Sequence, residues 1–326
     1  MISSARICAI ALLAALGACS VSHAQTSAAR KTVLVTSIVE HPALDAVKDG
    51  LKEELLARGF EDGKNLRFEF QTAQGNPAVA AQIARQYVGA APNVIVAIST
   101  ASAQAVVSAT RTVPVVFSAI TDPVSAKLVP GPGASKTNVT GISDMAPVAD
   151  HLALIREMLP RSKNLGVVYS PGETNSIAGL NLLKGQARLQ GFNVIESPAQ
   201  RSADVPAATR ALVGKVDLVY VPQDNAVASA LDAVIDVATR SKIPVFAADE
   251  PSVVKGALAT IGFDYFQLGR QTAVLVAQIL GGQDAGTVPW KVGSGTDLIV
   301  NTAAAKRLGI TLPESVLKRA ERVVEN

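Results

Sequence analysis

Short runs of β-branched and apolar residues alternate along the chain with longer segments whose apolar positions recur every three or four residues. Residues 32–38 form the first run, and its Val-Leu-Val centre predicts a buried strand. In residues 42–55 the apolar positions repeat with helical spacing, and Gly59 stands where the end of a helix favours glycine. Strands that alternate with helices in this way predict parallel sheets with helices on both faces.

The pattern occurs twice, with matched spacing. Gly191-Phe192 follows Gly59-Phe60 by 132 residues, at the end of an equivalent expected helix. We therefore expect an α/β fold of two Rossmann-like lobes with parallel sheets. The further expected strands are residues 66–71, 94–98, 113–117, 165–169, 194–196, 218–221 and 244–247, and the further expected helices are residues 78–88, 101–110, 177–189, 206–213 and 227–238.

Composition narrows the class of protein. The 326 residues are 48% apolar and 17% charged, which suffices for a large core and about two domains. Lys and Arg number 30 against 27 acidic residues, the net charge is +3, and the sequence has no basic run, so nucleic acid is not an expected partner. Two cysteines and three histidines argue against a disulfide framework and against a metal site, and no cofactor is expected.

Sequence motifs for catalysis are missing as well. Residues 131–137 are similar to a phosphate-binding loop, but Ser135 stands directly before Lys136, where that loop needs glycine. The sequence contains neither a G-x-S-x-G nucleophile elbow nor an H-E-x-x-H zinc motif. We therefore expect a protein that is not an enzyme.

The first 24 residues have the pattern of an export signal. Arg6 supplies a positive charge, residues 7–16 form an apolar stretch too short to span a bilayer, and small residues precede Gln25. An alternative is lipidation, because residues 16–19 (Leu-Gly-Ala-Cys) resemble a lipobox that would anchor the chain through Cys19. Either way, we expect a periplasmic protein.

Ligands of open α/β sheets bind beyond the carboxyl ends of the strands. The candidate ligand-binding residues at these ends are Ser37, His41, Ser99, Thr100, Ala101, Ser118, Thr121 and Asp122 in the first lobe, and Glu173, Asn175, Ser176, Gln223, Asp224, Asn225 and Asp249 in the second. The set contains hydroxyls, amides and carboxylates but no Lys or Arg, which argues against a phosphorylated ligand.

These residue types favour a zwitterionic amino acid. We expect the hydroxyls of Ser99, Thr100 and Ser176, with free N–H groups at helix N-termini, to hold its carboxylate. Asp224 or Glu173 is expected to face its ammonium group. A sugar is the alternative ligand, because carboxylates and amides also bind hydroxyl groups. Aromatic residues that end nearby strands either wall an apolar pocket or pack inside the sheets; these are Phe117, Tyr169 and Phe246.

Six segments carry a resemblance to a known family: residues 121–124 (TDPV), 138–141 (NVTG), 169–176 (YSPGETNS), 221–225 (VPQDN), 255–257 (KGA) and 301–313 (NTAAAKRLGITLP). On these motifs the chain resembles the bacterial ABC-transporter substrate-binding proteins of the TrpX-like kind, which have the type I periplasmic-binding fold. The resemblance covers about residues 32–324. Those members of the family whose ligands are known resemble binders of aromatic amino acids.

The resemblance implies how the chain divides. The first lobe would comprise residues 32–142 plus about 265–288, and the second would comprise residues 143–262 plus about 291–326. The chain would cross between lobes near residues 141–147, 262–265 and 289–297, and residues 265–280 would form a helix returned to the first lobe. Such crossings act as hinges that let two lobes close on a ligand.

The resemblance also implies a function. It is that of the periplasmic solute-binding component of an ABC importer, a monomer that works with an ABC permease in the cytoplasmic membrane. The expected ligand is an aromatic or branched apolar amino acid in the cleft between the lobes. The alternatives are an exported sugar-binding protein, a ligand-sensing partner of a membrane receptor, and an exported enzyme on the same fold.

Overall fold

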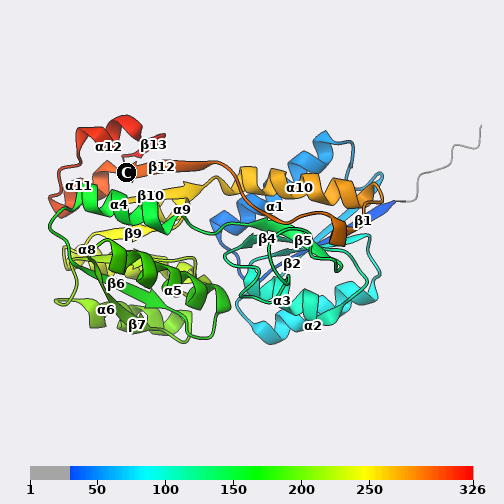
Figure 1. Cartoon of the computed structure of the whole chain (residues 1–326), viewed down its shortest axis with the longest axis horizontal. Coiled ribbons are helices and arrows are strands. Elements are labelled where there is room, and N and C mark those ends of the chain that lie inside the picture. The colour runs from blue at the N-terminus through cyan, green and yellow to red at the C-terminus, as the bar shows by residue number, and fades with distance from the viewer. Residues whose placement is uncertain (1–29, 326) are drawn as a thin grey trace, which may run out of the picture.

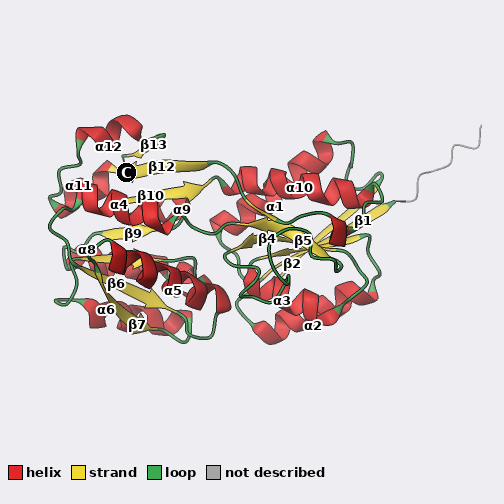
Figure 2. Cartoon of the chain, in the orientation of Figure 1, coloured by secondary structure: helices red, strands yellow, loops and turns green. Residues whose placement is uncertain are grey.

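Two α/β lobes lie side by side along the long axis of the molecule in the computed structural model, which describes residues 30–325 (Figure 1). Each lobe has a central sheet with helices on both faces (Figure 2). This architecture confirms the predicted fold class. The expected export signal, residues 1–24, lies outside the described residues. Within residues 30–325, no helix has the length and apolar character needed to cross a bilayer.

The sheet of the first lobe is parallel throughout, with the strand order β11-β5-β4-β3-β1-β2. Its strands are β1 (Lys31–Ser37), β2 (Leu66–Thr72), β3 (Val94–Ile98), β4 (Val115–Ile120), β5 (Val139–Ser143) and β11 (Lys291–Val292). Helices α1 (Pro42–Ala57) and α10 (Tyr265–Leu280) cover one face, and α2 (Pro77–Gly89) and α3 (Thr100–Ala109) cover the other.

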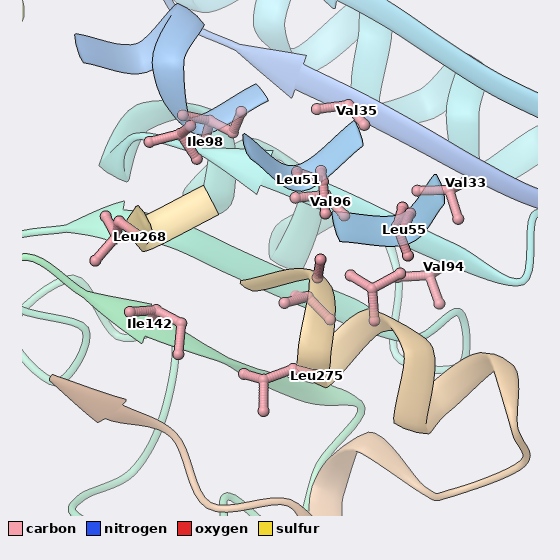
Figure 3. Packing of buried hydrophobic residues seen from close by; sticks show 14 of the residues in the cluster. Val33, Val35, Leu51, Leu55, Val94, Val96, Ile98, Ile142, Leu268 and Leu275 are labelled. Carbon is pink, nitrogen blue, oxygen red and sulfur yellow. The ribbon is translucent and has the colours of Figure 1, made fainter. Parts of the chain in front are cut away.

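Alternation along the strands builds the core of this lobe. Val33 and Val35 of β1 pack toward α1 and α10, whereas Leu34 between them packs toward α2 and α3. Figure 3 shows the first of these layers, with Leu51 of α1 and Leu268 of α10 among its side chains. Since most strands of the sheet are covered on both faces, they consist of apolar runs.

The backbones of α1 and α10 approach each other closely at two glycines. A Cβ at Gly50 would run into the backbone of Phe266, and a Cβ at Gly269 would run into that of Val47. Only glycine fits at either position. This close contact holds α10, which comes late in the sequence, against the first lobe. The helix expected at residues 265–280 is therefore present, and it packs on α1.

The second sheet has the order β13-β12-β10-β9-β8-β6-β7, with β12 antiparallel to β10. Its strands are β6 (Asn164–Tyr169), β7 (Asn193–Pro198), β8 (Leu218–Val221), β9 (Val245–Ala247), β10 (Ala259–Phe263), β12 (Thr296–Asn301) and β13 (Arg322–Val324). Its helices are α4 (Val148–Met158), α5 (Thr174–Leu189), α6 (Val205–Leu212), α7 (Asn225–Ser229), α8 (Leu231–Arg240), α9 (Glu250–Val254), α11 (Thr302–Leu308) and α12 (Glu314–Arg319). Short 3₁₀ turns occupy Ser202–Asp204 and Ala285–Thr287.

The repeat predicted from the sequence is present in three dimensions. The order β5-β4-β3-β1-β2 of one sheet matches β10-β9-β8-β6-β7 of the other. Gly59 (φ +87°) and Gly191 (φ +72°) both end their helices in the left-handed region. One expected element differs, because the helix predicted at residues 227–238 is divided at Ala230, whose backbone leaves the helical region (φ −117°, ψ 21°).

The connections between the lobes are bonded to one another. The chain passes from β5 to α4 at residues 144–147, from β10 to α10 at residue 264, and from β11 to β12 at residues 293–295. The amide of Gly293 donates to the carbonyl of Ser143 at 2.7 Å, and the hydroxyl of Tyr265 donates to Asp144 at 2.9 Å. The three crossings thus form one hinge region at the side of the cleft.

Candidate ligand-binding cleft

The carboxyl ends of the strands of both sheets line a cavity between the lobes. The first lobe and the hinge contribute Val39, His41, Ala43, Leu44, Ser99, Thr100, Ala119, Thr121, Asp144 and Tyr265. The second lobe contributes Asn175, Pro222, Gln223, Asp224, Asn225, Ala228 and Asp249. A larger cavity shares Val39, Asn175 and Asn225 with it.

Three of the buried polar atoms of the first lobe that lack a hydrogen-bond partner within residues 30–325 belong to residues that line this cavity. They are the Oγ of Ser99, the Oγ1 of Thr100 and the Nε2 of His41. Ser99 and Thr100 stand at the N-terminus of α3, whose first N–H groups are also free of helical partners. A buried polar group without a partner is costly, so these atoms indicate a place where a ligand completes the site.

The backbone around these hydroxyls is strained. Ser99 has φ +75°, and Ala119 on the adjacent strand has φ +55°, in a region that non-glycine residues seldom adopt. Both residues line the cavity, and the pairing of β4 with β5 is irregular at Ala119. Strain of this kind persists at sites where function requires a particular direction of backbone or side chain.

Asp144, in the hinge region, is among the residues that line the cavity. Its Oδ2 accepts from the hydroxyl of Tyr265, whereas its Oδ1 has no partner in the described part of the chain. Gln223 of the second lobe donates to the Asp144 carbonyl at 2.6 Å. Burial raises the pKa of Asp144 to about 6, because the charged form is poorly solvated there.

The two acids expected to face the ammonium group are hydrogen-bonded inside the second lobe. Asp224 accepts from the amide of Ser170 and the hydroxyl of Ser176, both at 2.6 Å, and from the amide of Val227 at 2.9 Å. Burial and then the charge of Glu173 raise the pKa of Asp224 to about 6. The carboxylate of Asp224 thus holds the segment that follows β6 and the N-terminus of α7.

Glu173 serves the start of α7 in the same way. Its two oxygens accept from the amides of Asn225 and Ala226, both at 3.0 Å, and from the side chains of Asn175 and Asn225. It lines the larger cavity. The two carboxylates therefore organise the wall of the second lobe, whereas Asp144 keeps an oxygen without a partner in the described part of the chain.

The structure brings together most of the residues proposed from the sequence. His41, Ser99, Thr100, Thr121, Asn175, Gln223, Asp224, Asn225 and Asp249 line the central cavity. Ala101 and Glu173 line the larger cavity instead.

Four candidates lie outside both sets of lining residues, and their role as ligand contacts stays a prediction. The hydroxyl of Ser37 donates to the Val39 carbonyl, and that of Ser118 bonds Thr272 in the core. Asp122 accepts from the next residues of its own turn, and Ser176 donates to Asp224. In each case a local or buried partner satisfies the side chain.

The sequence prediction missed Asp144, Tyr265 and the apolar part of the wall. Asp144 follows β5, a strand of only five residues that was not expected, although an acid directly after Ile142-Ser143 is the same signal used elsewhere. Of the two roles expected for the aromatic residues, packing is the one seen: Phe117 and Phe246 are buried in the cores of their lobes, and Tyr169 packs against the second core. Val39, Ala43 and Leu44 supply apolar surface instead.

A direct contact joins the two lobes opposite the hinge. The side-chain amide of Gln104 on α3 donates to the hydroxyl of Thr174 at the start of α5, at 3.2 Å. The lobes therefore meet on both sides of the cavity. Among the described residues, no three His, Cys, Asp or Glu side chains gather as metal ligands would.

Comparisons with known proteins agree with this arrangement. The model of the family described as ABC transporter substrate binding protein matches residues 32–324. A tyrosine-binding protein of Clostridioides difficile is 37% identical over 279 residues, which is 86% of this chain and 81% of the relative.

Two solved structures of relatives differ in how well they superimpose on this chain. A domain from Streptococcus pneumoniae in complex with L-Trp superimposes with a TM-score of 0.88 at 32% identity, covering 91% of this chain and 100% of that one. The ligand-free, open structure of a substrate-binding protein from Clostridium difficile has a TM-score of only 0.70 at 39% identity, with the same coverage of both chains. The lobes of this chain are thus arranged more as in the ligand-bound relative.

Proposed function

Because this chain belongs to the family of ABC transporter substrate-binding proteins, which are binding proteins and not enzymes, we propose that it captures an amino acid for an ABC importer. The ligand lies in the cleft between the two lobes and is released to the permease when the lobes separate. Hinged closure around a small molecule is a standard transition of such proteins.

One observation carries the proposal: uncommitted polar atoms of opposite character lie along one edge of the same cavity. The hydroxyls of Ser99 and Thr100, at the positive end of the ten-residue helix α3, suit a carboxylate. The free Oδ1 of Asp144, two strands away in the same sheet, suits an ammonium group. These are the two ends of a zwitterionic amino acid.

The ligand's side chain is aromatic. Apolar residues of both lobes line the cavity, namely Val39, Ala43 and Leu44 in the first lobe and Pro222 and Ala228 in the second. Such surface favours an apolar body in the ligand. Two relatives at 37% and 32% identity are described as binding tyrosine and L-Trp, which supports the aromatic class over branched apolar amino acids.

The protein acts outside the cytoplasm with its permease. Members of this family are extracytoplasmic, and the pattern of residues 1–24 supports export to the periplasm. The chain works as a monomer that starts at Gln25 or at a lipidated Cys19. Intact-mass measurement of the protein purified from its native host distinguishes the two, and an unprocessed Met1 start refutes export by this signal.

Calorimetric titration tests the ligand. L-Tyrosine, L-tryptophan and L-phenylalanine should bind, whereas N-acetyl-L-tyrosine and L-tyrosinamide, which lack the ammonium and the carboxylate charge respectively, should not. Both derivatives keep the ring of the parent, and L-tyrosinamide also keeps its size. Binding of a sugar with no binding of any amino acid would refute the proposal, and so would equal affinity for the parent and both derivatives.

A further inference from the structure

We propose that His41 reads the side chain of the ligand: its Nε2–H donates a hydrogen bond to an oxygen on the ring, so that a phenol is preferred over a phenyl group. This inference rests on the proposed function and adds the residue that decides specificity within it. It follows from the tautomer of His41, its surroundings and its unmet hydrogen bond.

The tautomer follows from a backbone contact. His41 is the N-cap residue of α1, and its Nδ1 accepts from the amide of Ala43 at 3.3 Å. Because an amide N–H can only donate, Nδ1 must carry a lone pair, and in a neutral imidazole the proton then resides on Nε2. Burial lowers the pKa of His41, which keeps the ring neutral at physiological pH.

The donor thus formed has nothing to bond to inside the protein. His41 is 7% exposed, and its Nε2 has no partner from any residue that the structure describes. His41 also lines the central cavity. An N–H in this position disfavours a purely apolar neighbour and favours an acceptor on the ligand.

The surroundings indicate which part of the ligand supplies that acceptor. Within its own segment His41 is flanked by Val39, Ala43 and Leu44, which form the apolar wall. The groups suited to the zwitterion, Thr100 and Asp144, lie on other strand ends. The Nε2–H is therefore the polar group within the apolar wall, where the ligand's side chain lies.

The charges near His41 fit a hydroxyl group there. Asp249 caps α9 in the second lobe and lines the same cavity; burial lowers the pKa of His41, the charge of Asp249 raises it, and the charge of Lys255 lowers it. A phenolic oxygen accepts from His41 and keeps its own proton for an acceptor such as this carboxylate. A phenyl ring does neither, and an indole N–H only donates.

His41→Asn tests the inference while keeping the helix cap, since asparagine also caps helices through its side-chain oxygen. The shorter amide ends before the position of Nε2. Calorimetry at pH 7.5 should show that the wild-type protein binds L-tyrosine about tenfold more tightly than L-phenylalanine, the factor expected of one buried hydrogen bond. In His41→Asn this ratio should fall to about one, mainly through weaker binding of L-tyrosine.

Ser99→Ala is the matched control at the carboxylate end. It should weaken L-tyrosine and L-phenylalanine equally and leave their ratio unchanged. Equal wild-type affinity for the two ligands, or an equal loss of both in His41→Asn, would overturn the role of His41 while leaving amino-acid binding intact. If no amino acid binds the wild-type protein, the proposed function fails, and this inference fails with it.

Discussion

The two lobes share a strand order but use their polar side chains in opposite ways. At the edge of the first lobe, Ser99, Thr100 and His41 keep buried atoms without partners in the range 30–325. At the edge of the second, Asp224 and Glu173 accept hydrogen bonds through both carboxylate oxygens. Polar side chains at the same topological place therefore differ in role: those of the first lobe keep atoms available for the proposed ligand, and those of the second lobe hold the loops and helix starts of the opposite wall.

The difference has an energetic basis. A buried donor or acceptor without a partner costs about 1–3 kcal/mol, and a ligand that supplies the partner recovers this free energy as affinity. A carboxylate that accepts several buried N–H and O–H groups instead stabilises the fold. We therefore expect changes in the first lobe to act on binding and changes in the second to act on stability.

The largest effect is expected from Asp224→Ala. The change leaves the amides of Ser170 and Val227 and the hydroxyl of Ser176 without their acceptor, and should lower the free energy of unfolding by about 2–4 kcal/mol. Urea denaturation followed by circular dichroism measures it. Asp122→Ala is the control, because that carboxylate also accepts from two amides and a serine but near solvent, and it should cost less than about 1 kcal/mol. Equal losses of stability would contradict the comparison.

Asp144→Asn should act on binding. The amide keeps an acceptor for Tyr265 but removes the charge, so affinity for a zwitterionic amino acid should fall by about 10- to 100-fold, the worth of a charge-assisted hydrogen bond of about 1.5–3 kcal/mol. The stability of the ligand-free protein at pH 7.5 should not fall, because a buried charge is removed. Calorimetry and urea denaturation together decide it; unchanged affinity would show that the ammonium group is held elsewhere.

A pH dependence should accompany this role. The pKa of Asp144 is raised to about 6 in the folded protein, so the carboxyl is ionised above pH 6 and protonated below it. Since an ammonium group needs the ionised form, affinity should decrease below pH 6 by up to tenfold per pH unit.

The ionisation of Asp144 should favour ligand binding but lower the stability of the folded protein. Because the folded state binds the proton more tightly than the unfolded state, where the pKa is near 3.8, stability should decrease as the pH rises from about 4 to 6 and then level off. Asp224 titrates in the same range, so the test is the difference between the wild-type protein and Asp144→Asn. A binding pH profile that is identical in both would exclude Asp144 as its source.

Thr100→Val should change stability and affinity in opposite directions. It replaces a buried hydroxyl that is unpartnered in the described chain by a methyl group of similar size, so the ligand-free protein should gain about 1 kcal/mol. Affinity should fall about fivefold. Thr36→Val is the matched control, since its buried hydroxyl on β1 also lacks a partner within residues 30–325 but lies away from the cavity; it should gain stability without losing affinity.

The smallest effect is expected from Gln104→Ala at the contact between the lobes. Loss of the hydrogen bond to Thr174 should weaken all ligands two- to threefold alike, because closure rather than recognition is affected. Gln86→Ala, on the exposed face of α2, is the control and should have no effect. A loss that differs between ligands would place Gln104 among the recognition groups.

Local signals in the sequence determined the repeating architecture. Helix ends at Gly59 and Gly191, strands with apolar runs, and polar residues directly after them are short-range patterns, so the two lobes and the row of Ser99, Thr100 and Asp224 could be found without coordinates. These features depend on neighbours a few residues away, which is what a single sequence records.

Only the tertiary structure decided which polar groups are satisfied. The partners of Asp224 lie 54 and 48 residues away in the chain, at Ser170 and Ser176, and the hydroxyl of Tyr265 reaches Asp144 across 121 residues. Since hydrogen-bond satisfaction is settled by such distant contacts, the sequence could not separate the saturated carboxylate of Asp224 from the free oxygen of Asp144. The fold surrounds the carboxylate of Asp224 with hydrogen-bond donors of the second lobe. It leaves Asp144 at the cavity with an oxygen that has no partner within residues 30–325.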